Sequence, residues 1–232
     1  MRIQFAALTC LTLLAGCGSS GGTNGGSAST SFTGVVSAID GTTTGALSFA
    51  IATASPDVGV PTGVALVQSS VTGTLKFNGL PAIQLTGTYE STTGALTLSG
   101  GGYSFTGTFD GQSSVQGTFT GPNGASGGFA TTETSSSSTA SNYCGSYARN
   151  DLSDAGTFSV VISGSSILGR WASSVDGSTG GLSGSVSGNN ITINVSPAGT
   201  VATGTRSGTT ISGTFTDPNS GGSGTWQGAV CQ

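Results

Sequence analysis

Four side chains in the C-terminal half of the sequence are of types that could hold a small ligand: Tyr147, Arg149, Trp171 and Trp226. Aromatic rings beside one cation can bind a sugar or a planar molecule, because ring faces attract cations and bury apolar surface. The alternative is that the rings fill a hydrophobic core and that Arg149 is a surface charge. The sequence alone leaves both interpretations open.

The candidates for catalysis are few. The chain contains no histidine, the commonest general base and metal ligand, so a Ser-His-Asp triad is excluded. Lys76 is the only lysine and has no motif around it. Asp151 and Asp154 lie in DLSDAG, whose spacing does not match a calcium loop, so a solvated hairpin turn is the simpler interpretation. Nothing brings Glu90 and Asp110 to a glycosidase-like separation. We therefore expect no enzymatic activity, no metal site and no cofactor.

The residues that must position these side chains follow a repeated pattern of apolar, any, Gly, any, apolar. It occurs as Phe105-Gly107-Phe109 and again over 211–215. Successive side chains of a strand point to opposite faces, so this spacing places all three residues on one face. That face must be the interior, because it carries the aromatics. Small barrels bend their strands sharply, and glycine permits the bend or admits a neighbouring ring.

The chain consists of two similar halves. Residues 117–123 (GTFTGPN) match residues 213–219 (GTFTDPN) at an offset of 213 − 117 = 96, and the Ser/Thr-rich segment 132–141 separates the halves. We predict domains over 31–131 and 142–232. Tight-turn signals such as Asp110-Gly111 favour up-and-down connections. The predicted fold class is all-β, with two tandem antiparallel up-and-down β-barrels of about eight strands each.

The expected strands follow the short alternating runs. In the first half they cover 32–38, 46–53, 63–68, 70–77, 82–89, 95–99, 103–109, 113–119 and 126–131. In the second half they cover 143–149, 156–163, 166–173, 181–187, 190–195, 200–206, 209–216 and 223–231.

The cysteines predict one disulfide. Of the four, Cys10 lies within an N-terminal apolar run and Cys17 ends it, which leaves Cys144 and Cys231 as an even pair. A disulfide between them is expected in an oxidising compartment, and two free thiols are the alternative. The two cysteines fall in the first and last predicted strands of the second domain. Those strands are neighbours in a closed barrel, so the bond would lock its seam.

The N-terminus reads MRIQFAALTCLTLLAGC, a charged start followed by a short apolar run and small residues before Cys17. The run is too short to span a bilayer and has the three-part layout of a secretory signal. Its ending, Leu-Ala-Gly-Cys, resembles the lipobox of bacterial lipoproteins. The resemblance implies a signal peptide over 1–16 and lipid on Cys17. A plain secretory signal with an incidental cysteine is the alternative.

A tether and a location follow from that resemblance. Residues 18–30 (GSSGGTNGGSAST) cannot bury apolar surface, so 17–30 would form a flexible lipidated tether. We expect a lipid-anchored protein of the bacterial cell envelope, with the membrane as its partner through Cys17. Gly18 in place of Asp favours the outer membrane by the sorting rule of enteric bacteria; its periplasmic face and the cell surface both remain open. The net charge is −4, and −5 once Arg2 is removed, which argues against nucleic-acid binding.

A second resemblance concerns the barrels. Residues 145–174 (GSYARNDLSDAGTFSVVISGSSILGRWASS) resemble the first strands of avidin-type barrels, and residues 85–91 (LTGTYES) resemble a streptavidin strand. The resemblance implies an eight-stranded antiparallel barrel with a ligand at its open end. Biotin binding is not implied, because that family uses several tryptophans and this chain has only Trp171 and Trp226. Arg149 also stands where a neutral amide is expected.

Three functions fit these observations. The first is a non-enzymatic structural or binding role in the cell envelope. The second is a carrier that holds a small ligand in a barrel mouth. The third is an extended adhesin-like array in which the repeat continues one sheet, with paired edges between repeats. A filled barrel interior favours the structural role, and an open aromatic-lined cavity favours the carrier.

Overall fold

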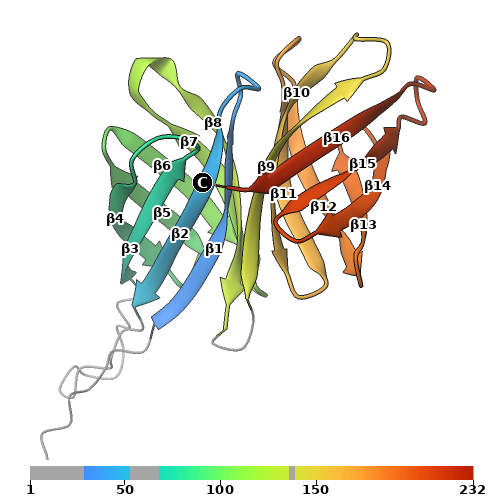
Figure 1. The fold of residues 1–232 in the computed structure, drawn as a ribbon. Helices are drawn as coiled ribbons and strands as arrows, with labels where there is room; N and C mark the ends of the chain where they lie inside the picture. The colour runs from blue at the N-terminus through green and yellow to red at the C-terminus, as the bar shows by residue number, and fades with distance from the viewer. Residues whose placement is uncertain (1–28, 53–67, 136–138, 232) are drawn as a thin grey trace, which may run out of the picture.

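The computed structural model describes residues 29–52, 68–135 and 139–231. They form two closed antiparallel barrels of eight strands each, barrel 1 from β1–β8 and barrel 2 from β9–β16 (Figure 1). The predicted fold class is confirmed. Each strand pairs with its neighbour in the sequence, and the pairs β1–β8 and β9–β16 close the two barrels. No helix within the described ranges is long and apolar enough to cross a membrane.

The strands of barrel 1 are β1 (Ser29–Ala38), β2 (Thr44–Ala52), β3 (Gln68–Phe77), β4 (Ile83–Glu90), β5 (Ala95–Gly100), β6 (Tyr103–Phe109), β7 (Ser114–Thr120) and β8 (Ser126–Thr134). The strands of barrel 2 are β9 (Ala140–Arg149), β10 (Ala155–Ser163), β11 (Ser166–Ser173), β12 (Thr179–Ser187), β13 (Asn190–Ser196), β14 (Thr200–Ser207), β15 (Thr210–Thr216) and β16 (Ser223–Val230). A short 3₁₀ turn (Pro122–Gly124) joins β7 to β8.

The expected strands of the second half each correspond to an observed strand. In the first half, the expected strand over 63–68 lies outside the described residues except for its last residue, which begins β3. The predicted linker is shorter than expected, because residues 132–134 belong to β8 and residues 140–141 to β9. Residues 29–30 belong to β1 rather than to the tether. The predicted signal peptide and Cys17 lie outside the described residues.

The repeated glycines lie where strands approach each other most closely. In barrel 1, Gly107 pairs with Gly117, and a Cβ on either would lie within 2.7 Å of the Phe129 ring. In barrel 2, Gly204 pairs with Gly213, and a Cβ on either would lie within 2.7 Å of Trp226. Each ring comes from the last strand of its barrel and covers a glycine pair. The two halves therefore repeat the same packing as well as the same sequence.

The interior of barrel 1 is filled by aromatic rings. Its core contains nine of them, Phe32, Phe49, Phe77, Tyr89, Tyr103, Phe105, Phe109, Phe119 and Phe129. They pack in contact, with ring centroids 5.0 Å apart for Phe32 and Phe49 and 5.7 Å apart for Phe105 and Phe129. Ring pairs at such separations contribute beyond their buried area. The interior of barrel 1 is therefore occupied by its own side chains.

The two barrels pack against each other through outward faces of β1, β8, β10 and β11 (Figure 1). Val35, Ala130, Val161 and Ala172 point away from their own barrel cores and are buried. The buried Ser159 hydroxyl donates to the carbonyl oxygen of Val36 across this interface at 3.1 Å. An apolar interface with a buried hydrogen bond therefore joins the two barrels into one body. The sequence predicts two domains but does not predict this contact between them.

Arg170 is the charged residue of this interface. It extends from β11 onto barrel 1, where its Nη2 donates to the Gly117 carbonyl oxygen at 3.2 Å. A Cβ on Gly128 would meet the guanidinium, so the absence of a side chain there makes room for it. Burial lowers the pKa of Arg170 from its ordinary value. No motif in the sequence marks Arg170 as an interface residue.

The disulfide between Cys144 and Cys231 is present, as predicted. Cys144 lies in β9, and Cys231 directly follows β16, with the two Cα atoms 5.1 Å apart. The backbone N–H of Cys231 also donates to Asn142 in β9 at 2.9 Å. The bond therefore joins the first and last strands of barrel 2, which are neighbours in the closed sheet.

Candidate functional site

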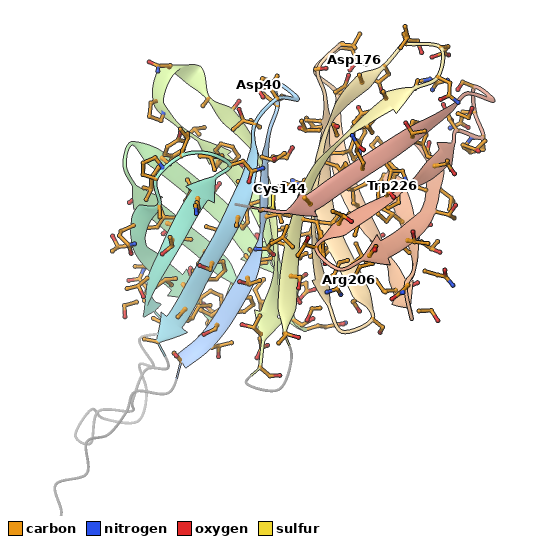
Figure 2. The ribbon with its side chains drawn as sticks, viewed as in Figure 1. Asp40, Cys144, Asp176, Arg206 and Trp226 are labelled. Carbon is orange, nitrogen blue, oxygen red and sulfur yellow. A yellow bond between two sulfur atoms is a disulfide. The ribbon has the colours of Figure 1, made fainter. Side chains whose placement is uncertain are left out.

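The two ends of barrel 2 are chemically different. Asp176, in the β11–β12 loop, lies at one end, and Arg206, near the end of β14, lies toward the other (Figure 2). Up-and-down strands place alternate loops at the same end. The loops β9–β10, β11–β12, β13–β14 and β15–β16 therefore meet at the Asp176 end, which we call the mouth.

A cavity of about 170 Å³ opens at the mouth. It is lined by Tyr147, Arg149, Asp154, Phe158, Trp171, Leu182, Ile193, Val195, Ala198, Thr200, Ala202, Phe215, Asp217 and Trp226. All four residues that the sequence analysis proposed as ligand-facing belong to this lining. The structure therefore brings them together, and their contact with a ligand stays a prediction.

The aromatic side chains of the cavity are held in fixed positions. Tyr147 packs edge-to-face on Trp171 and on Phe215, with centroid separations of 6.2 Å in both pairs. The indole N–H of Trp171 donates to the Ser196 carbonyl at 3.0 Å, and that of Trp226 to Thr214 at 3.2 Å. Because both indole donors already have backbone acceptors, these rings offer the cavity mainly apolar surface. A cavity with fixed apolar walls is suited to an apolar ring or chain.

Arg149 is not a free cation at the mouth. Its Nη1 donates to the Asp217 carboxylate at 3.2 Å, its Nη2 donates to the Ser220 hydroxyl at 2.9 Å, and its Nε lies 3.4 Å from Asp151. The side chain is only 15% exposed. Hydrogen bonds from Ser220 and then from the Asn219 backbone lower the pKa of Asp217, which favours its charged form beside Arg149. Arg149 therefore braces the β15–β16 loop.

Asp154 is the functional candidate that sequence analysis missed. Its carboxylate accepts hydrogen bonds from the Tyr147 hydroxyl at 3.2 Å and from the Ser173 hydroxyl at 2.6 Å, and it lines the cavity. Burial and then the charge of Asp154 raise the pKa of Tyr147, so its phenol stays protonated and donates. The expectation of a solvated turn is right for the exposed Asp151 and wrong for Asp154. No local signal distinguishes them, because the hairpin register alone turns Asp154 toward Tyr147.

The remaining acidic candidates, Asp110 and Glu90, accept hydrogen bonds within turns. Asp110 accepts the backbone N–H groups of Gln112 and Ser113, at 2.8 and 3.0 Å. Glu90 accepts the hydroxyls of Thr92 and Thr93 in the β4–β5 turn. In the described part of the chain, no group of three or more His, Cys, Asp or Glu residues could hold a metal ion.

Comparison of this sequence and its fold with known proteins identifies no similar protein. No protein-family model matches the sequence, no curated protein is significantly similar to it, and no solved structure matches it. The resemblances to lipoproteins and to avidin-type barrels therefore stay predictions.

Proposed function

We propose that the protein is a lipid-anchored binding protein of the bacterial cell envelope, without enzymatic activity, that holds a small ligand in the mouth of barrel 2. The observation that carries the proposal is the cavity of about 170 Å³ with aromatic walls. Barrel 1, filled by its own rings, would serve as the scaffold that supports barrel 2.

The cavity volume limits the ligand. An apolar cavity of about 150 Å³ engineered into another protein stays dry and binds benzene. The present cavity is similar, at about 170 Å³, and its deeper lining is aliphatic and aromatic. The ligand would therefore present one ring, or an aliphatic group of that size, to the barrel interior.

The direction of the mouth suits a tethered protein. β1 begins at the lower end of barrel 1 in Figure 1, whereas the β9–β10 and β11–β12 loops lie at the upper end of barrel 2. An anchor at Cys17 would attach at the β1 end. The mouth would then lie at the end of the molecule opposite the tether, where a ligand could enter.

The anchor is tested by replacing Cys17. The Cys17→Ser protein should move from the detergent phase to the aqueous phase, because the lipobox cysteine carries the lipid. Cys10→Ser is the matched control, since Cys10 belongs to the same apolar run and should not be lipidated. Retention of Cys17→Ser in the detergent phase would contradict the anchor.

The binding role is tested by filling the cavity. Ala202 lines it, whereas Val201 on the same strand points outward and is 45% exposed. Titration with 2-phenylethanol, followed by tryptophan fluorescence, should show binding to the wild type and to Val201→Phe but not to Ala202→Phe. Equal binding by both variants would place the probe elsewhere. Failure of the wild type to bind any ring-sized probe would favour a purely structural role.

A further inference from the structure

The charges at the mouth of barrel 2 are unequal. Among the residues that the structure describes, Arg149 is the only basic one that lines the cavity, and Asp154 and Asp217 line it as well. Arg149 forms both ion pairs found among the described residues, one with Asp151 and one with Asp217. Its positive charge is therefore already offset. Within the same described ranges, no cation is paired with Asp154, so the mouth carries excess negative charge.

Asp154 also differs from the other acidic residues at this end of the barrel in the groups that donate hydrogen bonds to its carboxylate. Asp151, Asp176 and Asp217 each accept the backbone N–H of the residue two positions later, at 2.8 to 3.0 Å. These bonds account for the three carboxylates as turn-stabilising groups. The Asp154 carboxylate instead accepts only side-chain hydroxyls, from Tyr147 and Ser173. The β9–β10 turn therefore does not use this carboxylate. It lines the cavity, and it also holds Ser173, which accepts the Val175 N–H of the β11–β12 loop.

The surroundings of Asp154 suit a positive group with an apolar body. Tyr147 donates to Asp154 and packs edge-to-face on Trp171, so one aromatic ring contacts the carboxylate and a second ring packs on the first. Ring faces and a carboxylate both attract an ammonium group. Behind them the cavity is lined by apolar side chains, among them Leu182, Ile193 and Trp226. A ring can enter this part only if its polar end stays at the mouth.

From this geometry we infer that the cavity selects a small organic amine, with its ring among the apolar side chains and its ammonium at Asp154. The inference rests on the proposed binding function and adds the chemical class of the ligand. A carboxylate ligand is disfavoured, because the Arg149 guanidinium is engaged and the uncompensated charge is negative.

Three probes with the same ring and different charge test the inference. They are 2-phenylethylammonium, 2-phenylethanol and phenylacetate, titrated by calorimetry into the full-length wild-type protein at pH 7. We expect the amine to bind about tenfold or more tightly than the alcohol, as for a hydrogen bond to a charged group, and phenylacetate to bind most weakly. Equal or tighter binding of the alcohol would overturn amine selectivity and leave the binding function standing. Binding of none of the three would overturn the binding function itself.

A variant assigns the selectivity to one carboxylate. Asp154→Asn keeps an oxygen acceptor for Tyr147 and Ser173 but removes the charge. Amine affinity should fall about tenfold or more while alcohol affinity stays within about twofold, since only the charged hydrogen bond is lost. Asp176→Asn is the matched control, because Asp176 lies at the same end in a turn and does not line the cavity. An equal loss in both variants would overturn the role of Asp154. The wild-type comparison of the three probes does not depend on either variant's folding.

Discussion

Gly213 in β15 is a position where one added methyl group should lower the stability of the protein substantially. A Cβ there would lie 2.0 Å from the Thr203 carbonyl oxygen, 2.6 Å from the Gly204 Cα and 2.7 Å from the Trp226 ring. Two of these atoms belong to the backbone of the adjacent strand β14, with which Gly213 is in register. Gly213→Ala therefore cannot be accommodated by turning a side chain.

The loss of stability in Gly213→Ala can be estimated from how far the two strands must move apart. A carbon-to-oxygen contact between strands is about 3.3 Å, so β14 and β15 would have to separate by about 1.3 Å at this point. Overpacking usually costs about 1–3 kcal/mol, and a clash with backbone belongs at the upper end. A loss of about 3 kcal/mol corresponds to a fall in Tm of about 6–12 °C for a chain of this size.

The assay is a thermal melt of the full-length protein followed by circular dichroism, with Gly181→Ala as the matched control. Gly181 lies in β12 of the same barrel, and a Cβ there would meet nothing within 4 Å. Gly181→Ala should leave Tm unchanged or raise it. Alanine lowers the conformational entropy of the unfolded chain, which stabilises the folded protein by about 0.4–1 kcal/mol. A Gly213→Ala protein that melts with the wild type would refute the close-packing explanation of the strand glycines.

Three further changes test the interface, the seam and one turn. Arg170→Ala removes a hydrogen bond across the barrel interface and should cost about 1–2 kcal/mol in urea unfolding; wild-type stability would mean that the contact does not couple the barrels. Replacing both Cys144 and Cys231 by Ser opens a loop with a sequence separation of 87 residues, and should cost about 4.6 kcal/mol on the chain-entropy estimate, whereas an unchanged Tm would contradict the locked seam. For Asp110, burial raises the pKa, but the Ser114 hydroxyl and three backbone N–H groups outweigh it and lower the pKa to about 2. The stability that these bonds contribute is fully present above the unfolded-state pKa of about 3.9, and it is lost as the pH falls through about 2. Between these pH values the Tm of Asp110→Asn should therefore depend less on pH than the wild-type Tm. Parallel curves of Tm against pH would show that the carboxylate does not stabilise the turn.

The strand pattern could be predicted because it is local. Alternation with period two follows from the geometry of one strand, so the inward face of Phe105-Gly107-Phe109 needs no knowledge of the partner strands. The Cys144–Cys231 bond was predictable for a related reason, because up-and-down order makes the first and last strands neighbours. Asp151 was also correctly placed in a turn.

The cavity could be predicted only in part. The sequence identified Tyr147, Arg149, Trp171 and Trp226 as one group, and the structure places all four at the mouth. It did not reveal that Arg149 is occupied by Asp217, because the β15–β16 loop that brings the two together is distant in the chain.

The sequence by itself determined the strands, their inward faces, the disulfide and the duplication, because each depends on short-range periodicity or on the order of elements. Only the tertiary structure decided the rest. The two halves share one motif, yet the interior of barrel 1 is filled and that of barrel 2 holds a cavity. The volume of a cavity is the small difference between the space that the strands enclose and the total volume of the side chains inside it, so a shared strand motif does not determine it. The buried faces at Val35 and Val161, like the orientation of Asp154, depend on contacts between segments far apart in the chain, and no local pattern records those contacts.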